Sequence, residues 1–330
     1  MHYDIWKYCT KDQWIQYLLS MNLTGNLRLS DEKKLALLYE LSNHAEEHYT
    51  TIRIPKHSGG LRVIRQPDSL LKYIQRQILF RILVQIPVSD CAFAYRKGFS
   101  AADNARPHAG KDTVLKLDIH DFYENITFAA VYQHAFPETL FPPPIRTLLT
   151  HLCCYDSILP QGAPTSPCIS NLVMRPFDET MKQWCGEQGI TYTRYCDDMT
   201  FSGHFPGNTA REVIDKTRGF LLRLGFELNQ KKTRLIRRGC RQEVTGYTVN
   251  DRVRTSKDYR RKLRQEWYYI RKFGLEEHLK TLLGTSHVTD AQKNSYLQSF
   301  TGRIAHVLRT DPQNTVFLAI QKEVKLMRDS

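Results

Sequence analysis

The sequence contains no long hydrophobic run, and this absence limits where the protein can act. Hydrophobic residues make up 41% of the chain, yet no apolar stretch approaches the roughly eighteen residues that a membrane-spanning helix needs. The first residues, MHYDIWKYCTKDQW, also lack the apolar core of a secretory signal peptide. We therefore expect a soluble, cytoplasmic protein with no membrane partner.

Cysteine is present, but not in a pattern that binds zinc or builds a disulfide framework. The cysteines are Cys9, Cys91, Cys153, Cys154, Cys168, Cys185, Cys196 and Cys240. Only one pair is adjacent in the sequence, and the Cys-x-x-Cys spacing does not occur. We expect buried, reduced thiols and no zinc.

Acidic residues are outnumbered by basic ones, which gives the chain a strong positive charge. It has 47 Lys and Arg against 34 Asp and Glu, a formal net charge of +13 over 330 residues. An aromatic content of 11% argues against a disordered basic tail, and this length suggests about two domains with a substantial core. The pattern indicates an anionic partner, most simply nucleic acid.

Three aspartates stand where strand-like runs end or turn. Asp118 ends the apolar run VLKLDI, and Asp197 and Asp198 lie between ITYTRY and MTFSG, which have the composition of two strands. An Asp-Asp pair in a hairpin is usually only turn chemistry. With a third aspartate on an adjacent strand, such a pair can hold two magnesium ions about 4 Å apart, as the joining of a nucleoside triphosphate to a 3′-hydroxyl requires.

The region between these aspartates carries a family resemblance. Residues 159–167, LPQGAPTSP, form a rigid Pro/Gly loop that runs into the amphipathic stretch CISNLVMRPFDETMKQW. In order and spacing, Asp118, this loop and YCDD resemble motifs A, B and C of reverse transcriptases. Asn104-Ala105-Arg106-Pro107-His108 matches the NAxxH signature, and Val244-Thr245-Gly246 the VTG signature, of retron reverse transcriptases. The chain thus resembles a bacterial retron reverse transcriptase over roughly residues 50 to 250.

The resemblance implies an α+β fold of the right-hand polymerase type, with fingers, a palm containing an antiparallel sheet, and a helical thumb. We expect a helical extension at 1–49, fingers and palm at 50–250, and a basic helical thumb at 251–330. One departure is Cys196, where many bacterial members carry alanine, and it bears on primer-end fit and fidelity rather than on activity.

Local patterns predict the individual elements. Thr10 and Ser30 look like helix starts, and TIRIP and LRVIRQP read as two strands around Ser58-Gly59-Gly60, followed by the long helix SLLKYIQRQILFRILVQI. Helices are expected within 127–155 and near 209–224. GFELN and TRLIR are expected to be strands that complete the palm.

The resemblance also implies roles around the aspartates. Asp118 and Asp197 would be the main metal ligands, helped by the main-chain carbonyl of Ile119, and Asp198 would support the charge balance. The expected cofactor is Mg²⁺, two ions per active site, with Mn²⁺ as a substitute. Tyr123 would block a ribose 2′-hydroxyl and so select deoxynucleotides, although it could instead be a core aromatic.

Further residues would surround the incoming deoxynucleoside triphosphate. Arg62 matches the family's triphosphate-binding arginine, with Lys56 as a weaker candidate, and each could instead be a surface strand charge. Lys232 matches a late lysine that could protonate the leaving pyrophosphate, with its neighbour Lys231 as the alternative. The remaining candidates for the nucleotide pocket are Asp121, Phe122, Gln161 and Gly162.

The tail SKDYRRKLRQEWYYIRKFG is the candidate thumb helix. As a helix it would align Tyr259, Leu263, Trp267 and Ile270 in one apolar stripe. Its cations would contact the phosphates of a template-primer duplex, the alternative being an ordinary solvated face. These cations are Lys257, Arg260, Arg261, Arg264 and Arg271.

Each of the two family signatures can be interpreted in two ways, as an RNA-recognition segment or as a structural one. Asn104 and His108 would share one helix face, although Pro107 limits the helix, and the family associates them with RNA recognition. A plain helix-capping role is the alternative. Val244, Thr245 and Gly246 are either an RNA-binding segment or a β-turn leading into the strand YTVN.

The resulting hypothesis is an RNA-directed DNA polymerase that copies part of a structured noncoding RNA, starting from a 2′-hydroxyl of that RNA. Its partners would be this RNA, the cDNA product, dNTPs and a separate effector protein in antiphage defence. The alternatives are another bacterial defence or group II intron-like reverse transcriptase, and an inactive RNA-binding scaffold.

Overall fold

In the computed structural model, which describes residues 6–55 and 59–329, the first helices begin at their expected caps. Thr10 and Gln13 form a reciprocal capping box at the start of α1 (Lys11–Ser20). The hydroxyl of Ser30 accepts the N–H of Lys33 at the start of α2 (Asp31–Asn43). Both helix predictions are confirmed, because each cap satisfies backbone N–H groups that the first turn leaves unpaired.

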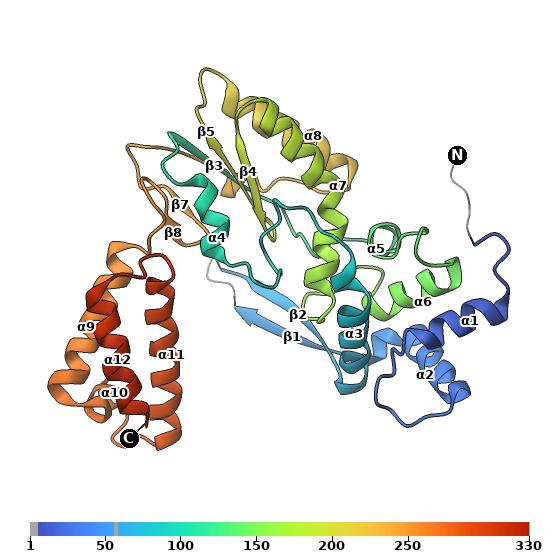
Figure 1. Cartoon of the computed structure of the whole chain (residues 1–330), viewed down its shortest axis with the longest axis horizontal. Coiled ribbons are helices and arrows are strands. Elements are labelled where there is room, and N and C mark those ends of the chain that lie inside the picture. The colour runs from blue at the N-terminus through green and yellow to red at the C-terminus, as the bar shows by residue number, and fades with distance from the viewer. Residues whose placement is uncertain (1–5, 56–58, 330) are drawn as a thin grey trace. The chain divides into compact units, whose positions relative to one another are not determined.

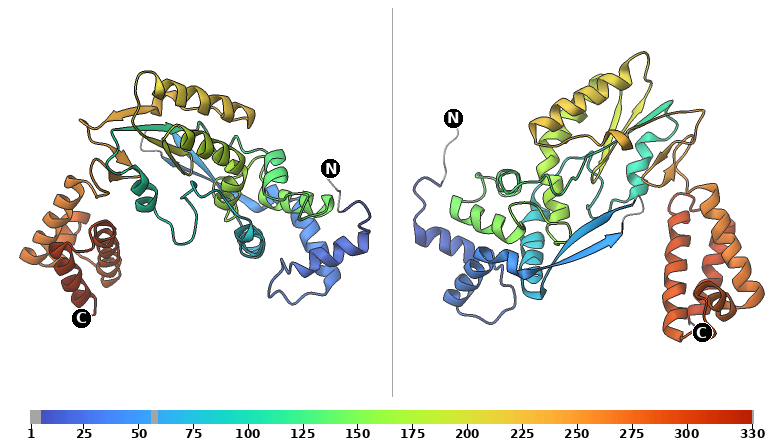
Figure 2. Two further views of the ribbon diagram at one scale, coloured as in Figure 1. Left: turned by 45° about the horizontal axis from the view of Figure 1, so that its top comes forward. Right: turned by 180° about the vertical axis from the view of Figure 1, so that it is seen from behind.

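A long antiparallel hairpin follows, as the strand patterns predict. β1 (Tyr49–Pro55) pairs with β2 (Leu61–Pro67) along its whole length, and the two strands extend as an arm that is visible in Figure 2. Part of the predicted turn, Ser58, lies outside the described residues. Most of the hairpin is exposed, so its side chains are available to a ligand.

The helix after the hairpin is shorter than predicted. α3 (Ser69–Arg81) is capped by Asp68 but ends at Arg81, and only the short 3-10 turn η2 (Leu83–Gln85) continues it. The chain leaves the helical conformation at Ile82, which has φ −121° and ψ −68°. Pro87 lies beyond the predicted end and does not account for the earlier one.

Four strands form the central sheet, in the order β4–β5–β3–β6. β3 (Thr113–Asp118) is almost completely buried, and β4 (Thr191–Tyr195) with β5 (Asp198–Gly203) forms the predicted hairpin. β6 (Arg234–Arg237) confirms the TRLIR strand. GFELN does not form the predicted strand; it makes only one isolated bridge, Ile119↔Leu228, because β3 ends at Asp118 and the chain then turns.

Helices follow the strands along the chain, and some of them lie beside the sheet (Figure 1). The predicted helices are all present: α5 (Phe128–His134), α6 (Pro143–Cys153), α7 (Ser166–Glu187) and α8 (Thr209–Arg223). α7 packs against both β4 and α8. No helix among the described residues is long and apolar enough to cross a membrane.

The chain divides into two compact units. The first runs to Phe99 and continues through Lys116–Thr200 and Pro206–Arg234, and the second comprises Ser100–Leu115, Phe201–Phe205 and Leu235–Ser330. Beyond Leu235 the second unit contains β7 (Glu243–Val244), β8 (Tyr247–Thr248), α9 (Lys257–Phe273), α10 (Leu275–Leu283), α11 (Asp290–Leu308) and α12 (Thr315–Asp329).

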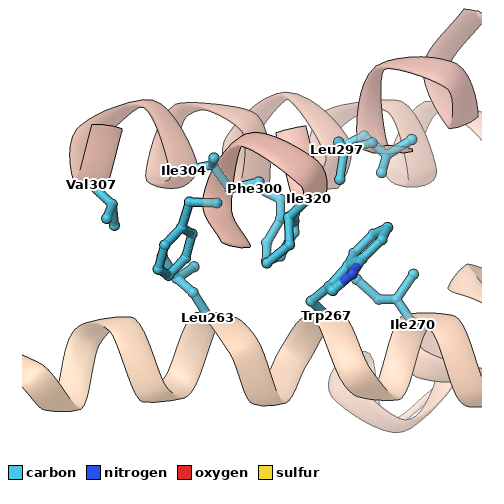
Figure 3. Close-up of a cluster of buried hydrophobic side chains, with 10 residues drawn as sticks. Leu263, Trp267, Ile270, Leu297, Phe300, Ile304, Val307 and Ile320 are labelled. Atoms are coloured by element: carbon cyan, nitrogen blue, oxygen red, sulfur yellow. The ribbon is translucent and has the colours of Figure 1, made fainter. Parts of the chain in front are cut away.

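The predicted apolar stripe of α9 faces a helical core. Leu263, Trp267 and Ile270 are buried against side chains of α11 and α12, including Phe300 and Ile320 (Figure 3). The stripe prediction is confirmed, and burying these large side chains away from water is what stabilises the bundle. Tyr259, the first residue of the stripe, packs at the edge of this core.

The cysteines are free thiols, as expected. Cys91, Cys153, Cys154 and Cys185 are buried, whereas Cys240 is exposed, so the expectation of burial holds for only part of the set. Burial raises the pKa of the Cys91 and Cys153 thiols to about 12, which keeps them protonated.

Candidate active site

The tight turn between β4 and β5 presents the aspartate pair. Cys196 and Asp197 form the turn, and Asp198 is the first residue of β5. Cys196 has a positive φ of 62°, a conformation that is costly for a residue with a side chain. The guanidinium of Arg194 stabilises the turn by donating a hydrogen bond to the Cys196 carbonyl at 2.9 Å.

A backbone hydrogen bond brings the third aspartate to this turn. The N–H of Ile119, directly after Asp118, donates to the carbonyl of Asp197 at 3.2 Å. Asp118 is only 4% exposed. One of its carboxylate oxygens, Oδ2, lies 2.8 Å from Nζ of Lys232, and the other, Oδ1, is buried without a partner among the described residues. The structure thus brings together the residues predicted from two distant segments.

The charges of this cluster are strongly coupled. Burial, followed by the charge of Asp197, raises the pKa of Asp198 to about 6. Burial likewise raises the pKa of Asp118, although the hydrogen bond from Lys232 opposes that effect. Burial alone would lower the pKa of Lys232, but its bond to Asp118 outweighs this and raises it. Crowded carboxylates of this kind favour a cation between them.

These residues suit an open magnesium site better than a site in which the protein supplies every ligand. Among the described residues, no group of three or more His, Cys, Asp and Glu side chains could hold a metal ion by itself. Magnesium commonly takes only one or two protein carboxylates and completes its shell with water and substrate phosphate. The unpartnered Oδ1 of Asp118 and the half-exposed Asp197 offer such ligands. The carbonyl of Ile119 remains a predicted ligand.

The loop after Asp118 places the predicted sugar-selecting residue beside the cluster. Asp121 turns the chain with a positive φ of 42°, and Tyr123 is half-buried with its hydroxyl bonded to that of Tyr95. The side chain of Phe122 is buried between Tyr123 and Phe226. Phe122 therefore packs against Tyr123. Because the Phe122 side chain is buried, only the Phe122 backbone is left for contact with a nucleotide.

The predicted floor residues join the hairpin arm to the loop before α7. The N–H of Arg65 on β2 donates to the carbonyl of Gln161 at 2.7 Å. A Cβ at Gly162 would lie 2.6 Å from the carbonyl oxygen of Arg65, so only glycine permits this approach. The two residues fix the base of the hairpin, a role that their sequence pattern did not reveal.

The residues predicted to bind the triphosphate and pyrophosphate differ in exposure and in contacts. Arg62 is exposed on β2 opposite Ile54, so its guanidinium is accessible to an anion. Lys56 lies outside the described residues. Lys231 is also exposed, but it is Lys232 whose amine reaches Asp118. The geometry therefore favours Lys232 over its neighbour.

The two family signatures pack against each other inside the second unit. Ala102 and Ala105 of α4 (Ala101–Ala105) share a buried cluster with Val244 and Tyr247 of the β7–β8 hairpin. The hydroxyl of Thr245 donates to the carbonyl of Ala101 at 2.7 Å. The segments far apart in sequence therefore form one small module.

Burial within this module limits direct RNA contact. Asn104 is 1% exposed, and neither of its amide atoms has a partner among the described residues. His108 lies on the 3-10 turn η3 (Arg106–His108), is fully buried, and bonds to Ser202 at 2.7 Å. Val244 is also buried, Thr245 is half-buried, and Gly246 is exposed. Of the two signatures, the exposed Arg106 and Pro107 and the turn at Thr245 and Gly246 can reach a ligand directly.

The predicted phosphate-binding cations of α9 are not equivalent. Lys257, Arg261 and Arg264 are exposed, although Arg261 pairs with Asp258 at 3.2 Å. Arg260 is half-buried and donates to the carbonyl of Thr255. Lys257 and Arg264, seven residues apart on one helix face, are the freest cations of the predicted set.

Two features of the site escaped sequence reasoning. Tyr95 contacts Tyr123 from a loop with no motif of its own. Arg194 forms a fully buried ion pair with Asp178 of α7, with 2.8 Å from Nε to Oδ1. In the sequence, this pair is visible only as one charged residue in each of two otherwise apolar elements. That pattern suggests a buried ion pair only if the two elements pack together.

Comparisons with known proteins agree with these features. Residues 54–271 match the family described as reverse transcriptase (RNA-dependent DNA polymerase). The chain is 37% identical over 235 residues to the retron Mx65 reverse transcriptase of Myxococcus xanthus, covering 66% of this chain and 55% of that one. It therefore spans little more than half of that relative.

Two relatives from Escherichia coli are covered more fully. The retron Ec86 reverse transcriptase is 29% identical, with 87% of this chain and 89% of the relative covered. The retron Ec83 reverse transcriptase is 32% identical, with 67% and 75% covered. A solved telomerase structure from Candida albicans gives a TM-score of 0.46 at 10% identity, covering 85% of this chain and 63% of that one, a likeness too weak to support a conclusion.

Proposed function

Because the chain belongs to the reverse transcriptase family, and within it to the retron reverse transcriptases, we propose that it polymerises DNA on an RNA template. The observation that carries this proposal is the backbone bond from Ile119 to Asp197, which brings the end of β3 to the turn that carries Asp197 and Asp198. A scaffold that only binds RNA has no need of a buried aspartate whose pKa is raised by burial and by a neighbouring aspartate, because crowding carboxylates away from water is costly.

In this mechanism Asp118 and Asp197 would hold two magnesium ions, with the Ile119 carbonyl as a further ligand, and Asp198 would balance the charge. When bound, such ions activate the attacking 3′-hydroxyl and stabilise the charge of the leaving pyrophosphate. Lys232 stays protonated beside Asp118, because its pKa is raised, and so can give a proton to the departing pyrophosphate. Mn²⁺ is expected to substitute for Mg²⁺.

The remaining pocket residues position the deoxynucleotide. Arg62, with Lys56, contacts the triphosphate, since a guanidinium matches phosphate oxygens in a planar, two-pronged geometry. The amide of Asp121 and the backbone of Phe122 line the sugar, and Tyr123 excludes a 2′-hydroxyl. Gln161 and Gly162 shape the floor below the new base pair.

We further propose that the template is part of a structured noncoding RNA. Synthesis would start from a 2′-hydroxyl of the same RNA and give a small branched RNA–DNA product. The NARPH and VTG segments and the retron relatives support this narrower proposal. By the same resemblance, the protein would act in the cytoplasm in antiphage defence with a separate effector protein. The helical extension, fingers with palm, and thumb would divide near residues 50 and 250.

Replacing one metal ligand tests the polymerase function. Asp197→Asn keeps the size of the side chain but removes a charge needed to hold both ions, so Mg²⁺-dependent dNTP incorporation should fall by roughly a hundredfold or more. RNA binding, measured by filter retention, should persist because it depends on phosphate contacts.

The control is Asp12→Asn, on the exposed first turn of α1, which should leave incorporation unchanged. A wild-type protein that binds RNA but incorporates no dNTP would establish the scaffold alternative. Near-normal synthesis by Asp197→Asn would refute the assignment of the metal ligands.

A further inference from the structure

A second tyrosine, Tyr95, lies against the sugar-selecting Tyr123, and we propose that it positions Tyr123 for the exclusion of ribonucleotides. This inference rests on the proposed polymerase function. The Tyr123 hydroxyl donates to the Tyr95 hydroxyl at 3.2 Å, and the Tyr95 hydroxyl donates to Sγ of Cys196 at 3.1 Å. Sγ of Cys196 lies 3.9 Å from the Tyr123 hydroxyl, so the three groups close a ring.

This ring joins three segments of the site. Tyr123 belongs to the loop after Asp118, Cys196 to the turn that carries Asp197, and Tyr95 to the loop after η2. Each group can donate and accept one bond, and bonds arranged in a closed chain strengthen one another. The position of the Tyr123 ring is therefore coupled to the turn that holds the metal ligands.

The backbone of Tyr95 is held firmly enough to act as a support. Tyr95 has a positive φ of 61°, which persists only where surrounding structure fixes it. The preceding loop pairs with β4: Arg194 N–H donates to the Cys91 carbonyl at 2.7 Å, and Phe93 N–H donates to the Arg194 carbonyl at 2.9 Å. The amide of Asn171 on α7 donates to the Ala94 carbonyl at 2.8 Å.

The same arginine holds the other end of the ring. While its backbone pairs with the Tyr95 loop, the side chain of Arg194 donates to the Cys196 carbonyl and is anchored by Asp178. The hydroxyl of Tyr192 also donates to Asp178, at 2.8 Å. Tyr95 and Cys196 are thus fixed relative to one buried ion pair, which makes them a stable frame for Tyr123.

This frame matters because exclusion by bulk requires a ring that cannot retreat. Tyr123 is only half-buried, so packing on Phe122 leaves part of its ring unsupported. The bond to Tyr95 restrains it on the hydroxyl side. Tyr95 itself is 51% exposed, so a change at its hydroxyl need not disturb a core.

The matched test is Tyr95→Phe, which keeps the ring and removes the hydroxyl. The measurement is the ratio of kcat/KM for a ribonucleotide to that for the matching deoxynucleotide, in single-nucleotide extension of a generic annealed template-primer. The free energy of one hydrogen bond corresponds to a factor of roughly three to ten in a rate or equilibrium constant. We therefore expect the kcat/KM ratio to rise by about that factor. Tyr17→Phe, which removes a hydroxyl bonded to the Leu140 carbonyl, should leave the ratio unchanged.

A double-mutant cycle shows whether Tyr95 acts through Tyr123. Tyr123→Phe removes the other partner of the same bond, so the double variant should raise the ratio no further than either single variant. Cys196→Ala removes the second partner of Tyr95 and should also raise the ratio. This variant tests the frame even if Tyr95→Phe fails to fold.

The possible outcomes distinguish a failure of the proposed role of Tyr95 from a failure of the proposed polymerase function. If the wild-type protein incorporates no dNTP, the proposed function falls and the role of Tyr95 falls with it. If the wild type is active but the ratio stays constant in Tyr95→Phe and Cys196→Ala, only the inference is overturned. Additive effects of Tyr95→Phe and Tyr123→Phe would show that Tyr95 acts independently of Tyr123 and would overturn it equally.

Discussion

One aromatic ring is proposed to decide which sugar enters the product. Tyr123→Ala removes the bulk that would meet a ribose 2′-hydroxyl, so the kcat/KM ratio of ribonucleotide to deoxynucleotide should rise by roughly 10- to 100-fold. Single-nucleotide incorporation measures this ratio, with the exposed Tyr8→Ala as control. An unchanged ratio would make Tyr123 a packing residue.

A second residue, His108, belongs to the NARPH signature but is buried, so we expect it to affect folding stability rather than to contact RNA. Burial, with the nearby charge of Lys111 as a smaller cause, lowers the pKa of His108 to about 3. In the unfolded chain a histidine pKa is about 6.5. Between these values the unfolded state binds a proton that the folded state does not, so stability falls as the pH falls below about 6.5.

We therefore expect His108 to contribute to acid sensitivity. Between pH 7 and pH 5 the free energy of unfolding should decrease by on the order of 2 kcal/mol more in the wild type than in His108→Gln. Chemical denaturation at the two pH values measures the difference. The exposed His287→Gln should behave like the wild type, and equal losses in wild type and His108→Gln would contradict the prediction.

At the scale of elements, α9 combines a buried face with an exposed basic one. Leu263, Trp267 and Ile270 anchor the helix in its core, which leaves Lys257 and Arg264 on the solvent side. Phosphate contacts are independent of sequence and weaken as salt rises, because binding releases counterions. The helix is thus suited to hold a template-primer duplex without choosing between RNAs.

Removing two of these charges should weaken binding to any structured RNA. For Lys257→Ala with Arg264→Ala, the slope of log K against log salt should become shallower by about 2. Lys322→Ala with Lys325→Ala removes the same charge from exposed positions of α12 and serves as the control. Loss of binding to the cognate RNA alone would mean that α9 itself reads the RNA.

At the scale of the whole molecule, we expect affinity for RNA and choice between RNAs to depend on different features. The net charge of +13 attracts any nucleic acid, whereas recognition of one RNA requires shape and base-edge contacts. The NARPH and VTG segments form a packed module in the second unit, with Gly246 exposed at its turn. We expect this module to act on RNA choice by presenting its exposed parts, namely Arg106 and that turn.

The nucleic acid that copurifies with the protein tests the proposed product. The wild type should carry RNA joined to a short DNA, so RNase treatment should leave DNA with a ribonucleotide remnant. Asp197→Asn should carry the RNA without the DNA, because binding survives while synthesis stops. Sequencing after separate RNase and DNase treatment measures both, and a heterogeneous RNA pool in the wild type would contradict a dedicated template.

The amino-acid sequence by itself determined most of the elements and singled out the three aspartates proposed as catalytic. Capping residues, strand runs and the apolar stripe of α9 act over a few residues, so they can be read locally. The same local reading failed for GFELN, whose pairing depends on where β3 ends. It also failed for the end of α3, because the chain leaves the helix at Ile82 although the apolar pattern continues.

Only the tertiary structure decided which predicted residues are accessible and which residues support them. His108 is hydrogen-bonded to Ser202, 94 positions away, and Tyr95 is hydrogen-bonded to Cys196, 101 positions away. Arg194 and Asp178 become a buried pair only when α7 packs on β4. Burial and hydrogen bonding depend on which surfaces meet, and spacing along the chain does not specify that.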